Sequence, residues 1–276
     1  MLNLAGETVK VSLDPACREA HVDARFGAFY TGEGAAAWEV SVEVLPRWRV
    51  PEGAGIFPGV GVRREGARWV FVRSTDVTTL DPETRRVTVQ ARASGHDLAP
   101  VEDPTPLDTP LRLLVAYSIV RRQGFLLHAA GYRDAARGGA LVFAAVSGGG
   151  KTTTARKLPH AGVLSDDQVA IVRAAGGFEA HALPFVGEYR RATAPGASPL
   201  KRVVLLGKAE APARSPVRPR EAATQLARCA VYFARGDAAV GQMFNTVLDV
   251  CEQVPVERWS MPRDFDVAPW VDAVLG

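Results

Sequence analysis

The residues whose types most clearly indicate a chemical function run from Ala145 to Thr153, with the sequence Ala-Val-Ser-Gly-Gly-Gly-Lys-Thr-Thr. Because glycine has no Cβ, consecutive backbone N–H groups of the three glycines can close around phosphate oxygens. Lys151 can then reach the β- and γ-phosphates, and the Thr152 hydroxyl can ligate Mg²⁺. The stretch therefore predicts a phosphate-binding loop, or Walker A motif, for ATP and Mg²⁺. The residues expected to contact the nucleotide are Ser147, Gly148, Gly149, Gly150, Lys151, Thr152 and Thr153.

This loop lies in the sequence context that such a motif needs. The continuous apolar run 141–146 predicts a strand buried on both faces, and residues 152–158 predict a short helix that Pro159 stops. The strict pattern G-x-x-x-x-G-K-[ST] is not met, because its first glycine is Ala145 here, which a looser form allows. The alternative is a glycine-rich turn beside a solvated lysine.

Two adjacent carboxylates, Asp166 and Asp167, lie between apolar runs in residues 162–173. Neighbours in a strand point to opposite faces, so the pair can face one site only if the chain bends there. Near a triphosphate, one carboxylate can ligate Mg²⁺ and the other can orient or deprotonate an attacking hydroxyl. The alternative is an exposed loop pair, or a helix-capping aspartate beside a bystander.

The first hundred residues predict a small antiparallel β module. Alternating runs separated by turn residues predict strands at 8–12, 38–45, 60–64, 68–73 and 86–92. Glu65-Gly66 and residues 81–84 predict hairpin turns. The proline-rich segment 99–110 predicts a domain boundary, which we place between residues 1–104 and 105–276.

The second domain alternates predicted strands and helices. Further strands are expected at 125–133, 176–183, 200–206 and 255–261. Apolar residues at helical spacing predict helices at 111–123, 220–234, 237–254 and 267–275. The alanine-, proline- and arginine-rich segment 207–219 predicts a flexible connection.

Composition bounds the class of protein. The chain has 276 residues, 47% hydrophobic and 23% charged, which is ordinary for a globular protein. The net charge of +3 is spread along the chain, so we expect no nucleic-acid partner. Three scattered cysteines favour neither a disulfide framework nor a zinc site. With no signal peptide and no apolar run of about 18 residues, we expect a cytoplasmic protein that does not enter membranes.

The segments 125–133, 145–153 and 164–169 occur in the order and at about the spacing seen in HPr serine kinase/phosphorylase. From about residue 106 to 276 the chain resembles that catalytic domain, which is similar to the nucleotide-binding core of ATP-dependent phosphoenolpyruvate carboxykinase. The resemblance implies an α/β P-loop kinase domain of that architecture, and relatives of this kind commonly form homo-oligomers. The glycine-arginine-asparagine signature of true HPr kinases is absent, so HPr itself is not the expected substrate.

Carried over by position, the resemblance implies catalytic roles for His128, Lys151 and Asp166. Lys151 binds the transferring phosphate, Asp166 is the general base, and His128 lies close to the γ-phosphate. On chemistry alone, a single histidine in an apolar strand is more often structural. The implied metal ligands are Thr152, Asp166 and Asp167, and the candidate substrate contacts are Glu188, Arg190 and Arg191.

These features predict an ATP- and Mg²⁺-dependent kinase that moves the γ-phosphoryl group to a hydroxyl, a serine in a peptide or protein being the leading acceptor. A small-molecule acceptor is the nearest alternative. A nucleotide-binding regulatory or scaffolding module with little turnover is another, motivated by Ala145 and the absent second signature. Phosphorolysis and carboxykinase-type chemistry form a third. The acceptor is not encoded in any pattern of the sequence.

Overall fold

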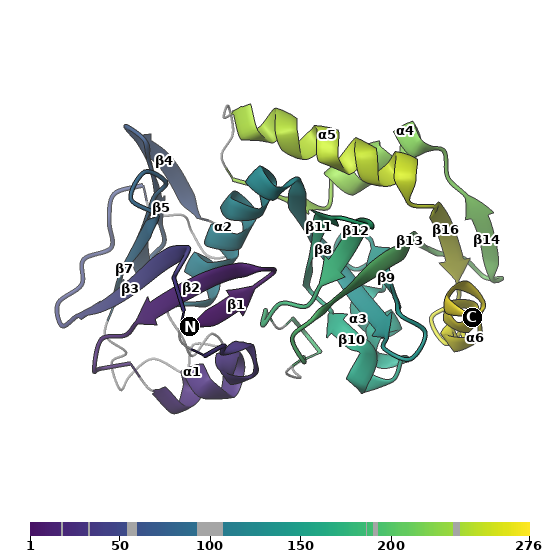
Figure 1. Cartoon of the computed structure of the whole chain (residues 1–276), viewed down its shortest axis with the longest axis horizontal. Coiled ribbons are helices and arrows are strands. Elements are labelled where there is room, and N and C mark those ends of the chain that lie inside the picture. The colour runs from purple at the N-terminus through teal and green to yellow at the C-terminus, as the bar shows by residue number, and fades with distance from the viewer. Residues whose placement is uncertain are drawn as a thin grey trace. The chain divides into compact units, whose positions relative to one another are not determined.

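The chain folds into two compact units, Met1–Val115 and Ala116–Gly276. The structure is a computed structural model, which describes residues 1–17, 19–32, 34–53, 60–92, 107–185, 187–189, 193–233 and 238–276. Each unit is built on one large sheet (Figure 1). The domain boundary expected between residues 104 and 105 lies outside the described residues.

The first unit contains a seven-stranded sheet with the order β1-β2-β3-β7-β6-β5-β4. Its strands are β1 (Leu2–Leu4), β2 (Glu7–Ser12), β3 (Trp38–Leu45), β4 (Gly61–Glu65), β5 (Arg68–Val72), β6 (Asp76–Asp81) and β7 (Arg86–Arg92). Its other elements are helix α1 (Glu19–Phe26), the 3₁₀ turn η1 (Gly27–Phe29) and the first part of α2 (Asp108–Ser118). The sequence analysis missed β1, β6 and α1.

The prediction of a purely antiparallel first module is wrong, because β3 runs parallel to both β2 and β7. The connection from β2 to β3 includes α1 and η1, which is long enough for a crossover between parallel strands. The strands β4 to β7 form antiparallel hairpins, and the turns predicted at 65–66 and 81–84 join β4 to β5 and β6 to β7. The hairpin turn at Gly66 has a φ of 63°, which glycine adopts without steric cost.

The second unit contains a nine-stranded sheet. Its strands are β8 (Gly124–Asp134), β9 (Gly139–Ala144), β10 (Val163–Ser165), β11 (Gln168–Ala174), β12 (Gly177–His181), β13 (Ala197–Lys208), β14 (Ala213–Pro216), β15 (Ala230–Val231) and β16 (Val256–Met261). The helices are the end of α2, α3 (Lys151–Arg156), α4 (Pro219–Ala227), α5 (Ala238–Gln253) and α6 (Ala268–Leu275), with the 3₁₀ turns η2 (Ile119–Arg122) and η3 (His160–Gly162).

The expected α/β P-loop kinase architecture is wrong. The hairpins β8–β9 and β11–β12 are antiparallel, and β11 is also antiparallel to β8. Among the described strands of this unit, parallel pairing is limited to β13 with β9 and β13 with β16. A short turn, such as the one between β8 and β9, cannot return the chain to a parallel position and therefore joins antiparallel strands. The predicted order of strands and helices alone did not define how the strands pair.

Three further expectations about this unit need correction. The predicted flexible segment 207–219 contains the end of β13 and all of β14, which pairs with β16. The helix predicted at 220–234 ends at Ala227 and is followed by β15. The helix predicted at 111–123 changes to a 3₁₀ turn at Ile119. The predicted strand at 255–261 and the helices at 237–254 and 267–275 are confirmed within one or two residues.

One apolar core holds the end of this sheet that carries the candidate site. It joins alternate residues of β8, β9, β13 and β16 to side chains of α3 and α6, and its members are Ala130, Tyr132, Leu141, Phe143, Ala155, Leu158, Val163, Val204, Trp259, Val267 and Val271. Helices α3 and α6 therefore cover the same face of these four strands. This packing fixes the positions at which β9, β13 and β16 end.

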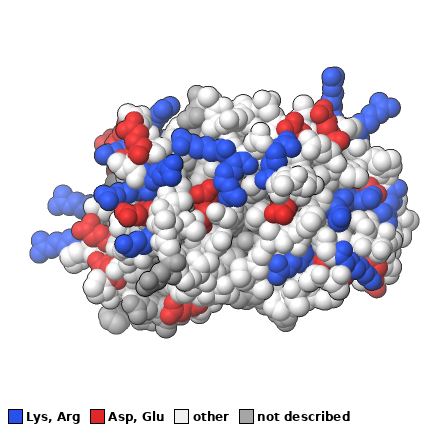
Figure 2. Space-filling model, viewed as in Figure 1, with Lys and Arg blue, Asp and Glu red and all other residues white. Residues whose placement is uncertain are grey.

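The surface carries both signs of charge. On the face in Figure 2, lysine and arginine side chains lie among aspartate and glutamate side chains. Ion pairs among the described residues include Arg86 with Glu39 and Arg63 with Glu65. Among the described residues, none of the helices combines the length and apolar character required to cross a bilayer.

Candidate functional site

A cleft of about 630 Å³ opens where the parallel strands β9, β13 and β16 end. The carboxyl ends of parallel strands are a common location for ligands. Every residue predicted to contact the nucleotide lines this cleft, together with His128, Asp166, Asp167 and Glu188. The other lining residues are Thr154, Lys157, Gly187, Leu206, Gly207, Lys208, Ala209, Met261, Pro262, Arg263 and Val267.

The glycine loop, residues 145–152, connects β9 to α3. Gly148 and Gly150 have φ angles of 74° and 98°, a region that other residues rarely adopt. Gly149 is required for a different reason: a Cβ there would lie 2.5 Å from the Cβ of Ala145 and 2.9 Å from the carbonyl oxygen of Val146. The Ala145 methyl group thus occupies space that the strict motif leaves empty, and Gly149 accommodates it.

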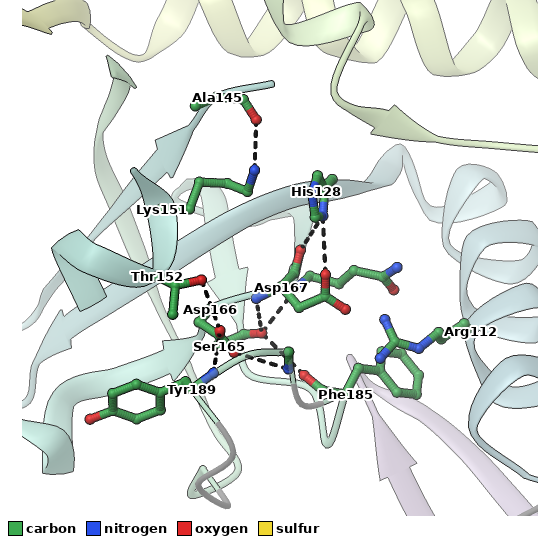
Figure 3. A network of polar contacts seen from close by, with 12 residues as sticks. Arg112, His128, Ala145, Lys151, Thr152, Ser165, Asp166, Asp167, Phe185 and Tyr189 are labelled. Atoms are coloured by element: carbon green, nitrogen blue, oxygen red, sulfur yellow. Dashed lines mark hydrogen bonds and ion pairs between the residues drawn. The ribbon is translucent and has the colours of Figure 1, made fainter. Parts of the chain in front are cut away.

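Lys151 is the first residue of α3 and is only 6% exposed. Its Nζ donates a hydrogen bond to the carbonyl oxygen of Ala145 at 2.9 Å (Figure 3). It also donates to the carbonyl oxygen of Val146 at 3.3 Å. Burial lowers the pKa of this ammonium group, and the nearby carboxylates of Asp166 and Asp167 partly oppose that shift. The Lys151 side chain therefore lies against its own loop, with Nζ on two of the loop's carbonyl oxygens.

Asp166 is 4% exposed, and its carboxylate accepts three hydrogen bonds. The Thr152 hydroxyl donates to Oδ2 at 3.2 Å, the Gly187 N–H to Oδ1 at 3.0 Å and the Tyr189 N–H to Oδ2 at 2.8 Å (Figure 3). A Cβ on Gly187 would lie 2.9 Å from Oδ2 of Asp166 and 2.9 Å from Cβ of Asp167. Glycine at 187 therefore lets the backbone approach the two aspartates closely.

The chain bends between β10 and β11, and Asp166 and Asp167 occupy the bend. The Ser165 hydroxyl stabilises it by accepting hydrogen bonds from the N–H groups of Asp167, at 3.1 Å, and Gln168, at 3.0 Å. The same hydroxyl donates to the carbonyl oxygen of Phe185 at 3.3 Å. The bend that the sequence required for a shared site is present, and both carboxylates line the same cleft.

His128 lies in β8 beside Asp167. Its Nδ1 is 2.9 Å from the backbone oxygen of Asp167 and 3.1 Å from Oδ1 of the same residue. A carbonyl oxygen can only accept, so Nδ1 carries a hydrogen and donates it. In the neutral ring, Nε2 is then the nitrogen that can accept a proton. His128 and Asp167 thus form a pair in which the aspartate fixes the tautomer and orientation of the ring.

The oxygen atoms beside the loop fit Mg²⁺ by chemical type. The described residues contain no group of three or more histidine, cysteine, aspartate or glutamate side chains that could hold a metal ion. Mg²⁺ usually takes one or two carboxylates and completes its shell with water and phosphate oxygens. The Thr152 hydroxyl and the carboxylates of Asp166 and Asp167 are a donor set of this kind.

A family model described as SynChlorMet cassette protein ScmC matches residues 110–259, which is more than half of the chain. The chain belongs to the ScmC family. A search among curated proteins gave no match. The matched segment includes His128, the whole glycine loop, both aspartates and the strands β13 and β16 as far as Trp259.

The resemblance to HPr serine kinase is therefore corrected, because the matching family is ScmC. The three motifs that carried the resemblance are short. Each can arise from local requirements alone: glycines where backbone must approach a ligand, a lysine for charge, and carboxylates at a strand end. Such needs recur in sites that belong to different families. The residues of this ScmC-family site must therefore be judged by their own geometry.

The structure of this ScmC-family chain describes one of the three candidate substrate contacts. Glu188 lines the cleft, and its carbonyl oxygen accepts a hydrogen bond from Nη2 of Arg156 at 2.9 Å. Arg190 and Arg191 lie outside the described residues. Glu188 is thus the member of this group that the structure places at the cleft.

The sequence analysis missed several residues that shape this ScmC-family site. Ser165 holds the bend, while Gly187 and the N–H of Tyr189 hold Asp166. The glycine at 187, between Phe185 and Tyr189, was a usable signal, because a glycine among large residues often marks close backbone approach. Lys208 and Arg263 also line the cleft, but their isolated positions in the sequence gave no signal.

Proposed function

We propose that the cleft binds the phosphates of ATP with Mg²⁺ and transfers the γ-phosphoryl group to a hydroxyl. One observation carries this proposal: the Lys151 and Thr152 of a glycine loop share a single cleft with Asp166, Asp167 and His128. Charge neutralisation, metal-ion oxygen donors and a proton acceptor are the components that phosphoryl transfer requires.

In this proposal the glycine loop and Lys151 bind the phosphates. Gly148 and Gly150 have no Cβ and a positive φ, so their backbone can approach an anion closely, whereas the Gly149 N–H donates to the carbonyl oxygen of Val146 at 3.0 Å. The Nζ of Lys151, now on the carbonyl oxygens of Ala145 and Val146, exchanges these partners for phosphate oxygens. A buried ammonium group gains more from a phosphate than from two carbonyl oxygens, because the interaction is between opposite full charges at low dielectric.

The two aspartates take different roles. The Asp166 carboxylate is held in place by three donors, one of which is the Thr152 hydroxyl, so we assign it with Thr152 to the metal side. Mg²⁺, when bound there, would neutralise charge on the phosphates. The pair of Asp167 and His128 is assigned to the acceptor, with Nε2 of His128 as the base. The resemblance had implied Asp166 as the base.

The transfer step balances without further reactants. The acceptor oxygen forms a bond to the γ-phosphorus, and the bond between that phosphorus and the bridging oxygen of ADP breaks. The proton of the acceptor hydroxyl passes to Nε2 of His128, while Asp167 stabilises the imidazolium through Nδ1. We propose a serine of a peptide or protein as the acceptor, with a small-molecule hydroxyl as the other outcome of an acceptor screen.

The test is transfer from γ-labelled ATP by the purified chain, with Mg²⁺ and a panel of serine peptides and small hydroxyl compounds. We expect labelled product with the wild type and a loss of at least about 100-fold in Lys151→Met and His128→Gln. Lys201→Met, which changes an exposed lysine of β13, is the matched control. Equal activity in Lys151→Met and the wild type would reject the proposal.

A nucleotide-binding module with little turnover is the second candidate. The contacts of Lys151 with its own loop, and the Ala145 methyl group packed against Gly149, favour it, because both hold the loop in a self-contained form. In this case ADP and ATP bind with Lys151-dependent affinity, but no acceptor and no water receives the γ-phosphoryl group. The assay above separates the two candidates directly.

A further inference from the structure

The order of strands divides the cleft into two chemically different halves. Strand β9 lies between β8 and β13, and β13 pairs in turn with β16. His128 of β8 stands on one side of the glycine loop with the two aspartates. On the other side, β13 ends at Lys208 and β16 ends at Met261, and these two residues are register partners. The loop is thus central, and the carboxylates lie on one side of it only.

The half of the cleft at the ends of β13 and β16 is lined by apolar side chains, which we call the apolar floor. Leu206 and Met261 are partly buried and pack against the core that joins the sheet to α3 and α6. Val267 is 1% exposed and lines the same cleft, as does Pro262. Apolar lining with a few polar groups is typical of sites that bind the organic part of a small ligand. No role in phosphate binding or proton transfer accounts for this floor.

Cations border the floor. Lys208 and Arg263 are exposed at the ends of β13 and β16, and both line the cleft. The segment after β16 is fixed in place, because Nζ of Lys157 donates to the carbonyl oxygens of Arg263 and, at 2.7 Å, Phe265. The Phe265 ring also packs on Trp270, with the ring centroids 4.6 Å apart. The segment that follows β16 is therefore held beside the cleft by these contacts.

We propose that this half of the cleft, at the ends of β13 and β16, binds the nucleoside of the phosphate donor. The donor is a linear molecule whose reacting phosphate must face Asp166, Asp167 and His128, so its other end extends past the loop toward β13 and β16. The aromatic base packs on Leu206 and Met261, and Lys208 and Arg263 face the phosphates nearest the sugar. The inference rests on the function proposed above.

The experiment compares the dissociation constants of ATP, ADP and inorganic tripolyphosphate, each with Mg²⁺, by calorimetry. Tripolyphosphate can fill the loop but has no nucleoside. We expect the wild type to bind ATP at least about tenfold more tightly than tripolyphosphate, and Met261→Ala to weaken ATP about fivefold with little effect on tripolyphosphate. Met261→Leu, which keeps an apolar side chain, is expected to behave like the wild type.

Photolabelling with 8-azido-ATP tests the same inference without a variant. Label recovered in peptides that contain residues 203–209 or 256–267 supports it, whereas label confined to peptides of β8 or β11 overturns it. If tripolyphosphate binds the wild type as tightly as ATP does, and Met261→Ala changes neither, the nucleoside site is rejected while phosphate binding stands. If neither compound binds the wild type, the proposed function fails with it.

Discussion

The Thr152 hydroxyl lies 3.2 Å from Oδ2 of Asp166, and this contact joins the first turn of α3 to the bend between β10 and β11. The two residues are 14 positions apart in the chain. Because Asp166 also accepts from the N–H groups of Gly187 and Tyr189, three separate segments meet at one carboxylate. The glycine loop, the bend and the segment 187–189 are therefore expected to respond together to ligands and to substitutions.

Thr152→Val removes the hydroxyl while keeping the shape of the side chain. The Asp166 carboxylate then loses one of its donors. We expect the gain in ADP affinity that Mg²⁺ provides to fall by about 10- to 100-fold, as for other groups that hold or orient metal ligands. Thr152→Ser retains the hydroxyl and serves as the control. Calorimetric titration of ADP with and without Mg²⁺ measures the effect. Identical Mg²⁺ dependence in the valine and serine variants would contradict the assignment of Thr152 to the metal side.

Gly187→Ala introduces a methyl group 2.9 Å from both Oδ2 of Asp166 and Cβ of Asp167. Either the carboxylates or the segment 187–189 must move, and we expect a loss of about 1–3 kcal/mol in the free energy of unfolding. Gly176→Ala is a matched control, since no atom lies within 4 Å of the added methyl group in that turn between β11 and β12. Urea denaturation compares the variants. Similar stability of both would show that the site adapts to the methyl group without cost.

Gly149→Ala is expected to disrupt the glycine loop because its methyl group would lie 2.5 Å from the Cβ of Ala145. Replacing Ala145 with glycine removes that contact but leaves the new methyl group 2.9 Å from the carbonyl oxygen of Val146. The double variant should therefore recover part of the ADP affinity that Gly149→Ala loses, and a double-mutant cycle gives the coupling. Strict additivity of the two substitutions would mean that Ala145 does not constrain Gly149.

The sequence predicted the local backbone of the candidate site better than the fold around it. Residues of the glycine loop are adjacent in the chain, and their types follow from local backbone requirements, so the loop and the flanking strand and helix were recognisable. The sequence also indicated the bend at Asp166 and Asp167, because neighbouring side chains of a straight strand point to opposite faces and could not share one site. Each of these features depends on fewer than about ten neighbouring residues.

The sheet order could not be obtained in the same way. Whether β13 pairs with β9, β12 and β16 depends on contacts between segments that are distant in the chain, and periodicity does not encode them. Ser165, Gly187 and Tyr189 reach Asp166 or the bend only because the strands place them there. The basic segment 207–219 looked flexible because its composition is polar and rich in proline, yet β14 pairs with β16 along it.

The buried ammonium group of Lys151 predicts a pH dependence of stability. Burial lowers its pKa in the folded protein from the ordinary value of 10.5, so the unfolded chain binds more protons in the interval between the two values. The cost of burying the charge is then fully present below the folded pKa and disappears as the pH rises toward 10.5. Stability should accordingly rise with pH across this interval.

Lys151→Met abolishes that contribution, and the difference in unfolding free energy between the variant and the wild type should shift in favour of the wild type as the pH is raised. Urea denaturation from pH 7 to 10.5 measures the difference, and comparing the two proteins cancels the titration of other groups. Lys201→Met, at an exposed position of β13, is the matched lysine-to-methionine substitution measured alongside it. A difference that is constant with pH would mean that Lys151 is solvated in the folded protein, and the loop would then lack the buried charge on which phosphate binding depends.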